Sequence, residues 1–205
     1  MNLKNYSENE NRRYFPMDKL SLKKMEYCVY GALQYYSERG EFDKERYVYK
    51  KKISLSKLER ELRTTRKTIS KRIDSMIKEG LIKEKNLDNG EVVYYLPCKS
   101  SKYLLLNLDL KDIKKLIFGT NDNVFRTYLL LKHRTEYLKA TKQKYTDMEI
   151  EQGFICENIG LSPTSRKLIP VYVEVLKDLG LIDFRMITIT EETKVKTKYL
   201  YTVLK

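Results

Sequence analysis

The sequence is poor in the residues that build metal centres and disulfide frameworks. Its 205 residues include a single histidine, His133, and three cysteines, Cys28, Cys98 and Cys156, which are far apart and form no CxxC pair. A zinc or redox site needs several such ligands close together, and an odd number of distant cysteines does not suit a disulfide framework. We therefore expect reduced cysteines that serve packing, no metal and no other cofactor.

Motifs of nucleotide-driven and nucleophilic enzymes are missing too. The chain has no GxxxxGK[ST] loop, which excludes the phosphate-binding loop of a helicase or a partition ATPase. A nickase or relaxase needs a histidine pair that holds a metal beside a nucleophilic tyrosine, and one histidine cannot supply it. The surroundings of His133 and Tyr137 do not resemble a recombinase site either, so we expect a binding protein and not an enzyme.

Long apolar runs are also absent. No stretch approaches the roughly 20 apolar residues that cross a bilayer, and residues 1–15 lack the apolar centre of a secretory signal. These two absences predict a cytoplasmic protein without a membrane partner.

Positive charge, in contrast, is abundant. Lysine and arginine number 41 against 28 acidic residues, a net charge of +13, and residues 51–72 hold nine basic side chains against Glu59 and Glu61. Duplex DNA is a dense line of phosphates, so such a cluster would gain affinity by releasing counterions. Solvated helix faces in a lysine-rich protein are the alternative, and charge alone does not choose between the two.

A pattern that recurs a hundred residues later favours DNA binding. The sequence from Thr65 is TRKTISKRIDSMIKEGLI, and the sequence from Ser165 is SRKLIPVYVEVLKDLGLI. The two align without a gap, and each is followed by a strand, a turn and a second strand. A helix that begins with Arg-Lys, ends at glycine and leads into a hairpin is typical of the recognition helix and wing of a winged helix-turn-helix.

The expected fold is therefore mainly α with small β hairpins, an α+β class, built as two winged helix-turn-helix domains in tandem. We expect a flexible arm over residues 1–16, a first domain over 17–100 as the main DNA reader, and a second domain over 101–205. Pro97 and the polar residues after it mark the boundary, although residues 103–108 could form a strand that ties the halves together.

Local signals place the elements of the first half. Apolar spacing predicts a helix over 22–39 that stops at Gly40, and a short strand over 48–53. Ser56 and Glu59 have the spacing of a capping box. Thr65 is expected to cap the recognition helix, which ends at Gly80. The strands 82–87 and 91–96 are expected to pair across Asp88-Asn89-Gly90, in which Asn-Gly is a strong hairpin signal because it accepts positive φ.

The second half is expected to repeat this order. The predicted elements are helices over 109–118, from about 124, over 154–161 and from Ser162 or Ser165 to Gly180, followed by a hairpin of 184–189 with 195–203.

The residues expected to contact DNA lie on the two recognition helices and the two wings. They are Thr64, Thr65, Arg66, Lys67, Thr68, Ser70, Lys71 and Arg72 on the first helix, Lys83, Lys85 and Asn89 on the first wing, and Arg166, Lys167, Lys194, Lys196 and Lys198 in the second half. Arg66, Lys67, Ser70 and Lys71 should reach base edges, whereas the wing lysines should contact phosphates.

The second recognition helix differs from the first. Pro170, Val171 and Val175 align with Ser70, Lys71 and Ser75. Proline normally kinks a helix interior, and valine offers no hydrogen bond to a base. We expect Val171 and Val175 to form the interface of a homodimer. The alternative is that both valines face the long helix of the second domain.

The first half also resembles a known family. Residues 15–97, and above all KISLSKLERELRTTRKTISKRIDSMIKEGLI, are similar to the N-terminal winged-helix domain of replication initiators from theta-replicating plasmids and phages of Gram-positive bacteria. Tandem winged helices also resemble iteron-binding initiators, in which one domain mainly dimerises and the other binds repeats near an origin. The resemblance implies double-stranded origin DNA and host replication proteins as partners. A transcriptional regulator of a phage or mobile element is the main alternative, and a protein-binding scaffold is the third.

Overall fold

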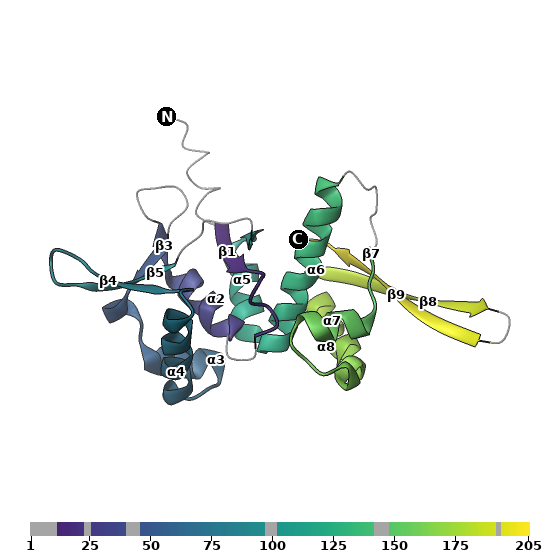
Figure 1. Cartoon of the computed structure of the whole chain (residues 1–205), viewed down its shortest axis with the longest axis horizontal. Coiled ribbons are helices and arrows are strands. Elements are labelled where there is room, and N and C mark those ends of the chain that lie inside the picture. The colour runs from purple at the N-terminus through teal and green to yellow at the C-terminus, as the bar shows by residue number, and fades with distance from the viewer. Residues whose placement is uncertain (1–11, 23–25, 40–45, 97–101, 142–147, 192–193) are drawn as a thin grey trace. The chain divides into compact units, whose positions relative to one another are not determined.

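The computed structural model describes residues 12–22, 26–39, 46–96, 102–141, 148–191 and 194–205, which form a mixed α+β fold (Figure 1). The chain divides into two compact units. The first unit comprises residues 1–19 and 23–122, and the second unit comprises 20–22 and 123–205. The division after Asp122 lies later than the boundary expected near residue 100.

The first unit holds two small antiparallel sheets and the helices around them. Its elements are β1 (Arg12–Pro16), α2 (Tyr27–Tyr36), β2 (Glu38–Arg39), β3 (Arg46–Tyr49), the 3₁₀ helix η1 (Lys50–Lys52), α3 (Leu55–Leu62), α4 (Arg66–Lys78), β4 (Lys83–Asn86), β5 (Val92–Leu96), β6 (Tyr103–Asn107) and α5 (Leu110–Gly119).

Strands β1 and β6 explain why the boundary lies beyond residue 100. They pair in antiparallel register, with Tyr14 opposite Leu105, and Phe15, Leu104 and Leu106 are buried. The expectation of a flexible arm over residues 1–16 is therefore wrong for Arg12–Pro16, because these residues gain main-chain hydrogen bonds and bury an apolar side chain; residues 1–11 lie outside the described part. The strand considered for 103–108 is present, and it belongs to the first unit.

Helix α2 is the centre of the first unit. Residues 27–34 are all buried, among them Tyr27, Tyr30 and Leu33. The helix ends at Tyr36 and not at Gly40, since the Ser37 hydroxyl donates to the main-chain oxygen of Gln34 at 2.7 Å. The buried guanidinium of Arg46 then fixes Ser37, with Nε donating to its hydroxyl at 2.6 Å.

Two predictions about the segment before α4 are corrected. Strand β3 ends at Tyr49, and Lys50–Lys52 turn into η1 with all three lysines exposed, so no strand reaches residue 53. Helix α3 begins at Leu55, and its cap is Ser54, whose hydroxyl accepts from the Lys57 N–H at 3.2 Å. Ser56 lies inside the helix, so the capping box predicted at Ser56 and Glu59 does not form.

The predicted limits of the following helix and hairpin agree well with the structure. Thr65 caps α4, and Gly80, at φ +70°, follows its end. Strands β4 and β5 pair antiparallel, and their connection is closed by hydrogen bonds between Leu87 and Glu91 at 2.8 Å and between Gly90 and Leu87 at 2.9 Å. The loop thus consists of residues 88–90, as expected, with Gly90 supplying the positive φ of 78°.

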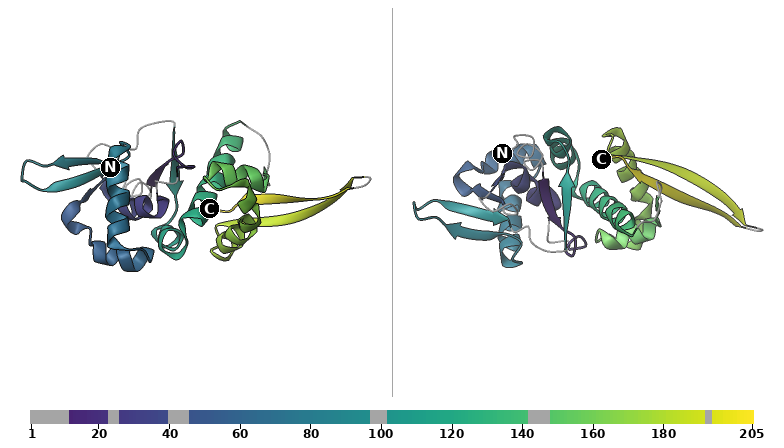
Figure 2. Two further views of the ribbon diagram at one scale, coloured as in Figure 1. Left: turned by 60° about the horizontal axis from the view of Figure 1, so that its bottom comes forward. Right: turned by 90° about the horizontal axis from the view of Figure 1, so that it is seen from above.

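The second unit repeats part of this order, since its elements match α2, β3, α3, α4, β4 and β5 of the first unit. The elements of the second unit are α6 (Asp122–Ala140), β7 (Met148–Glu149), α7 (Gln152–Asn158), the 3₁₀ helix η2 (Pro163–Leu168), α8 (Ile169–Asp178), β8 (Ile182–Glu191) and β9 (Lys194–Val203). The sheet order β7-β9-β8 corresponds to β3-β5-β4 in the first unit. Strands β8 and β9 are each ten residues long and run on as a two-stranded ribbon beyond the short β7 (Figure 2).

Pro170 does not kink the interior of a helix. The segment aligned with the start of α4 forms η2, capped by Ser162, and the α-helix begins only at Ile169. Pro170 therefore lies in the first turn of α8, where its missing N–H has no helical partner to lose. The recognition-like segment is thus a 3₁₀ helix that leads into an α-helix.

The short segment Leu20–Leu22 is bound by Arg126 of α6. The guanidinium of Arg126 is 3 % exposed and donates to the main-chain oxygens of Leu20, of Leu22 at 3.1 Å and of Ile159 at 3.4 Å. Gly160, at φ +77°, lies against the backbone of Ser21. A buried charge with three carbonyl partners fixes this segment within the second unit.

Candidate nucleic-acid interface

Helix α4 has one side that packs in the core and one exposed polar side. Ile69, Ile73 and Met76 are buried at helical spacing. The exposed side carries Lys67, Ser70, Lys71, Asp74 and Lys78, which we call the α4 stripe. Within the described residues, Lys67 and Lys71 form no ion pair, so their ammonium groups are available to an external anion.

The first turn of α4 is fixed by its own side chains. The Thr65 hydroxyl accepts from the Thr68 N–H at 3.2 Å and lies 2.9 Å from the Thr68 hydroxyl. Arg66 turns back to α3 and donates from Nε to the Glu59 carboxylate at 2.7 Å. This ion pair lowers the pKa of the Glu59 carboxyl. Arg66, one of the four residues expected to contact DNA bases, therefore already forms an ion pair with a carboxylate of its own chain.

The turn between α3 and α4 adds basic side chains that the sequence analysis did not single out. Arg63 ends α3 in the left-handed conformation, at φ 52°, and both Arg63 and Arg60 are exposed. Thr64, which follows in the turn, is half-buried, and its N–H donates to the main-chain oxygen of Glu59 at 3.3 Å. The only sequence signal for the two arginines was their place in the basic stretch 51–72.

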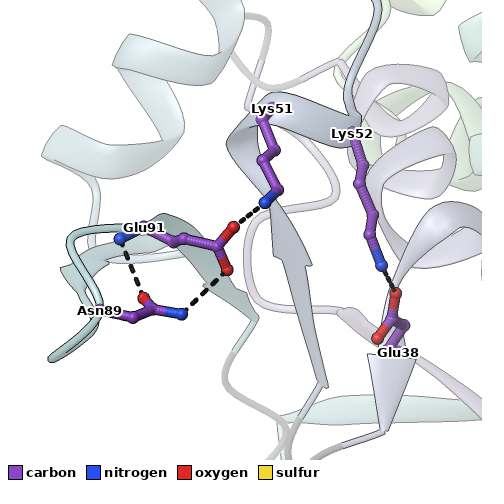
Figure 3. Close-up of polar contacts among 5 residues, drawn as sticks. All are labelled: Glu38, Lys51, Lys52, Asn89 and Glu91. Carbon is purple, nitrogen blue, oxygen red and sulfur yellow. Dashed lines mark hydrogen bonds and ion pairs between the residues drawn. The ribbon is translucent and has the colours of Figure 1, made fainter.

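Much of that basic stretch is neutralised by carboxylates from other elements. Lys51 pairs with Glu91, and Lys52 with Glu38 at 2.5 Å (Figure 3). Arg72, expected to contact DNA, instead pairs with Glu26 beside α2, at 3.4 Å. Its side chain therefore belongs to the packed side of α4, and the effective positive charge of the segment is smaller than its sequence indicates.

Strands β3, β4 and β5 bring a group of tyrosines and lysines to one sheet face. Tyr47 is opposite Tyr95, and Tyr95 is opposite Lys83. The ammonium of Lys85 lies 4.0 Å from the centre of the Tyr95 ring, and that of Lys52 lies 4.6 Å from the Tyr49 ring. We call this surface the tyrosine face; it consists of Tyr47, Tyr49, Tyr95, Lys52, Lys83 and Lys85.

The tyrosine face explains where the predicted wing lysines lie. Side chains alternate along a strand, and the opposite face of the same sheet carries the buried Val48, Tyr94 and Leu96. Lys83 and Lys85 are exposed on the outer face, where Lys83 lies opposite Tyr95 and Lys85 lies opposite the buried Val93. Asn89, at the hairpin tip, accepts from the Glu91 N–H at 3.0 Å and donates to the Glu91 carboxylate at 3.2 Å (Figure 3).

The second unit has fewer described cations on its corresponding elements. Arg166 and Lys167 are exposed on η2 and, within the described part of the chain, are free of ion pairs. Lys198 on β9 pairs with Glu149 at 2.8 Å. The side chains of Lys194 and Lys196 lie outside the described residues. The structure thus places Arg166 and Lys167 at the start of the recognition-like segment, as Arg66 and Lys67 are in the first unit.

Helix α8 also exposes apolar surface. Val171 is 57 % exposed and Leu168, just before the helix, is 40 % exposed, while Val175 is half-buried. Tyr172, Val173 and Leu176 supply the buried side. The exposure of Val171 disfavours the alternative that both valines pack against α6.

Neither a bilayer span nor a metal site emerges from this geometry. None of the described helices combines the length and apolar character that a membrane span needs. The described residues also bring no three histidine, cysteine or carboxylate side chains together as a metal site.

No family model matches the chain, and comparison with curated proteins finds no relative.

Proposed function

We propose that the protein binds double-stranded DNA in a sequence-specific manner through two winged helix-turn-helix units. The observation that carries this proposal is the α4 stripe, on which Lys67, Ser70 and Lys71 are exposed, unpaired in the described chain and mounted on a capped helix. A single helix of this kind fits the major groove, where lysine can donate to guanine and serine to any base edge. In this proposal α3 is the positioning helix, and the β4–β5 hairpin is the wing.

The remaining cations suit a supporting role. Phosphate contacts carry no base information but hold the protein in register on the duplex. Thr64, Arg63 and the wing lysines are placed on a turn and a hairpin that flank α4, and Arg166 and Lys167 offer a second set of contacts. In this division of roles the first unit reads the sequence and the second adds contacts to phosphates, or a dimer interface through Val171.

Within this class we propose a replication initiator of a plasmid or phage that binds repeats at an origin. Support comes from the resemblance of the sequence of residues 15–97 to that of such initiators, and from the matching strand orders β3-β5-β4 and β7-β9-β8 in the two units. The second candidate is a transcriptional regulator, which the exposed Val171 favours, because a two-fold dimer would bind an inverted repeat.

Footprinting of the purified protein on the DNA around its own gene tests both candidates. Protection of several direct repeats is expected for the initiator. One protected inverted repeat that overlaps a promoter would favour the regulator. Absence of any protected site, together with equal affinity for unrelated duplexes, would contradict sequence-specific binding.

A further inference from the structure

We propose that the tyrosine face of the first unit binds single-stranded DNA. Tyr47 and Tyr49 on β3 and Tyr95 on β5 are only partly buried, whereas Tyr27 and Tyr30 of the same unit are fully buried. The rings of Tyr47 and Tyr49 lie 5.5 Å apart in an edge-to-face arrangement. Aromatic surface that is left at the outer side of a sheet, and not in the core, is available to a ligand.

The cations on this face select the kind of ligand. Lys52 and Lys85 hold their ammonium groups beside the Tyr49 and Tyr95 rings, and Lys83 adds a third charge on the neighbouring strand. A nucleotide has a flat base that stacks on a ring and a phosphate that pairs with a cation, so both kinds of group find a partner here. A duplex hides its base faces within its own stack, and only an unpaired strand can offer them to tyrosine.

Two carboxylates pair with cations on and beside this face. Glu38 holds Lys52, and Glu91 holds Lys51, whose ammonium lies 5.9 Å from the Tyr49 ring (Figure 3). Both carboxylates occupy positions that a phosphate would take, and a bound strand would have to displace them. Removing the charge of Glu38 should therefore strengthen binding of a single strand.

The tyrosine face shares no residue with the α4 stripe, but its Lys83 and Lys85 are also the wing lysines of the proposed duplex site. Its residues come from η1, β3, β4 and β5, and none comes from α4. One unit could thus read a duplex through α4 and stack one separated strand on its tyrosine rings, with the wing lysines shared between the two. The choice of DNA over RNA rests on the proposed function.

The test uses the full chain and a fluorescent oligothymidylate of about 15 nucleotides, with binding followed by anisotropy at about 0.1 M salt. Tyr49→Leu with Tyr95→Leu keeps apolar bulk but removes the rings, and should weaken oligothymidylate binding about tenfold or more. The same variant should keep its affinity for duplex DNA. Glu38→Gln should bind the oligonucleotide more tightly than the unaltered protein.

Matched variants separate this inference from the proposed function. Lys67→Ala with Lys71→Ala should lose duplex binding and keep oligothymidylate binding. Lys52→Gln changes one exposed side chain that lies outside the proposed duplex site, and should weaken the oligonucleotide complex even if the tyrosine variant fails to fold.

Several results would overturn the inference. One is failure of the unaltered protein to bind oligothymidylate, and another is unchanged binding by the folded variants of the tyrosine face. Tighter binding of oligouridylate would overturn the assignment to DNA, and equal competition by polyglutamate would overturn the role of base stacking. If the unaltered protein binds oligothymidylate but no duplex, the proposed function is overturned and the inference about the tyrosine face is still supported.

Discussion

Arg66 and Glu59 form an ion pair across the turn between α3 and α4, with 2.7 Å between Nε and the carboxylate. The first side chain of the proposed recognition helix is thus held by the positioning helix. Since the pair lowers the pKa of Glu59, the carboxyl stays ionised below its usual range. Its stabilising effect is present above the unfolded pKa near 4.5 and is lost only as the pH falls through the lowered folded pKa.

Glu59→Gln should release Arg66 for a phosphate or a base. We expect duplex affinity to rise by about twofold to fivefold near neutral pH, because a competing carboxylate has gone. Anisotropy titrations of the variant and the unaltered protein measure this change, with circular dichroism as the control for folding. Weaker binding by a folded variant would mean that the pair positions Arg66 for DNA and does not withhold it.

Lys67→Ala with Lys71→Ala should abolish the specific gel shift and leave the helical content unchanged. A lysine that reaches a guanine edge discriminates by about 1 to 3 kcal/mol. Lys114→Ala with Lys115→Ala is the matched control, since it removes the same charge from exposed positions of α5. If Arg166→Ala with Lys167→Ala reduces specific binding far more, the second unit is the main reader.

Lys83→Ala with Lys85→Ala should weaken all duplex sequences to a similar extent. Phosphate contacts add to the salt dependence of binding, by nearly one counterion each. The slope of log K against log salt should therefore become shallower by about two. A loss restricted to the preferred site would contradict a purely phosphate-binding role for these two residues.

Val171→Lys with Val175→Lys tests whether α8 forms a dimer interface. In a two-fold dimer the variant would bring two lysines from each copy together, and repulsion should yield a folded monomer with weaker DNA binding. Sedimentation gives the oligomeric state. If the variant remains dimeric, the interface lies elsewhere; if the unaltered protein is a monomer, Val171 has another role.

Gly160→Ala should destabilise the second unit more than Gly180→Ala. Both glycines have positive φ, +77° and +69°, so each alanine carries a backbone cost of about 1 kcal/mol. Only at Gly160 would the new Cβ meet backbone, with the Ser21 carbonyl carbon at 2.9 Å. We expect an additional loss of about 2 kcal/mol in urea unfolding for Gly160→Ala. Equal stability of the two variants would show that the backbone at Ser21 moves away from the new Cβ at little cost in free energy.

Periodic and local features could be predicted from the sequence. The buried face of α4, the Thr65 cap and the β4–β5 hairpin follow from residues within one or two turns of each other. The cap of α3 was misplaced by two residues because serine stands at both 54 and 56. The half-buried Leu55 extends the apolar side of α3 and places the start of the helix.

Features that depend on distant partners could not be predicted. Nothing near Arg12–Pro16 indicates its pairing with residues 103–107. The tyrosine face needs the register of β3 against β5, which aligns Tyr47 with Tyr95. The ion pairs of Lys51, Lys52 and Arg72 have acidic partners outside the stretch 51–72, so counting charges within that stretch overestimated its free positive charge.

The segment Leu20–Leu22 has a consequence for how the protein can be divided into fragments. It belongs to the second unit, yet in the chain it lies between residues 1–19 and 23–122 of the first unit. A fragment that starts at Asn123 would lack two of the carbonyls that Arg126 binds and would leave a buried guanidinium short of acceptors. The hundred-residue repeat is therefore seen in the sequence but does not mark two separable parts of the structure. Dividing the chain between the two repeats would not yield two fragments that fold independently.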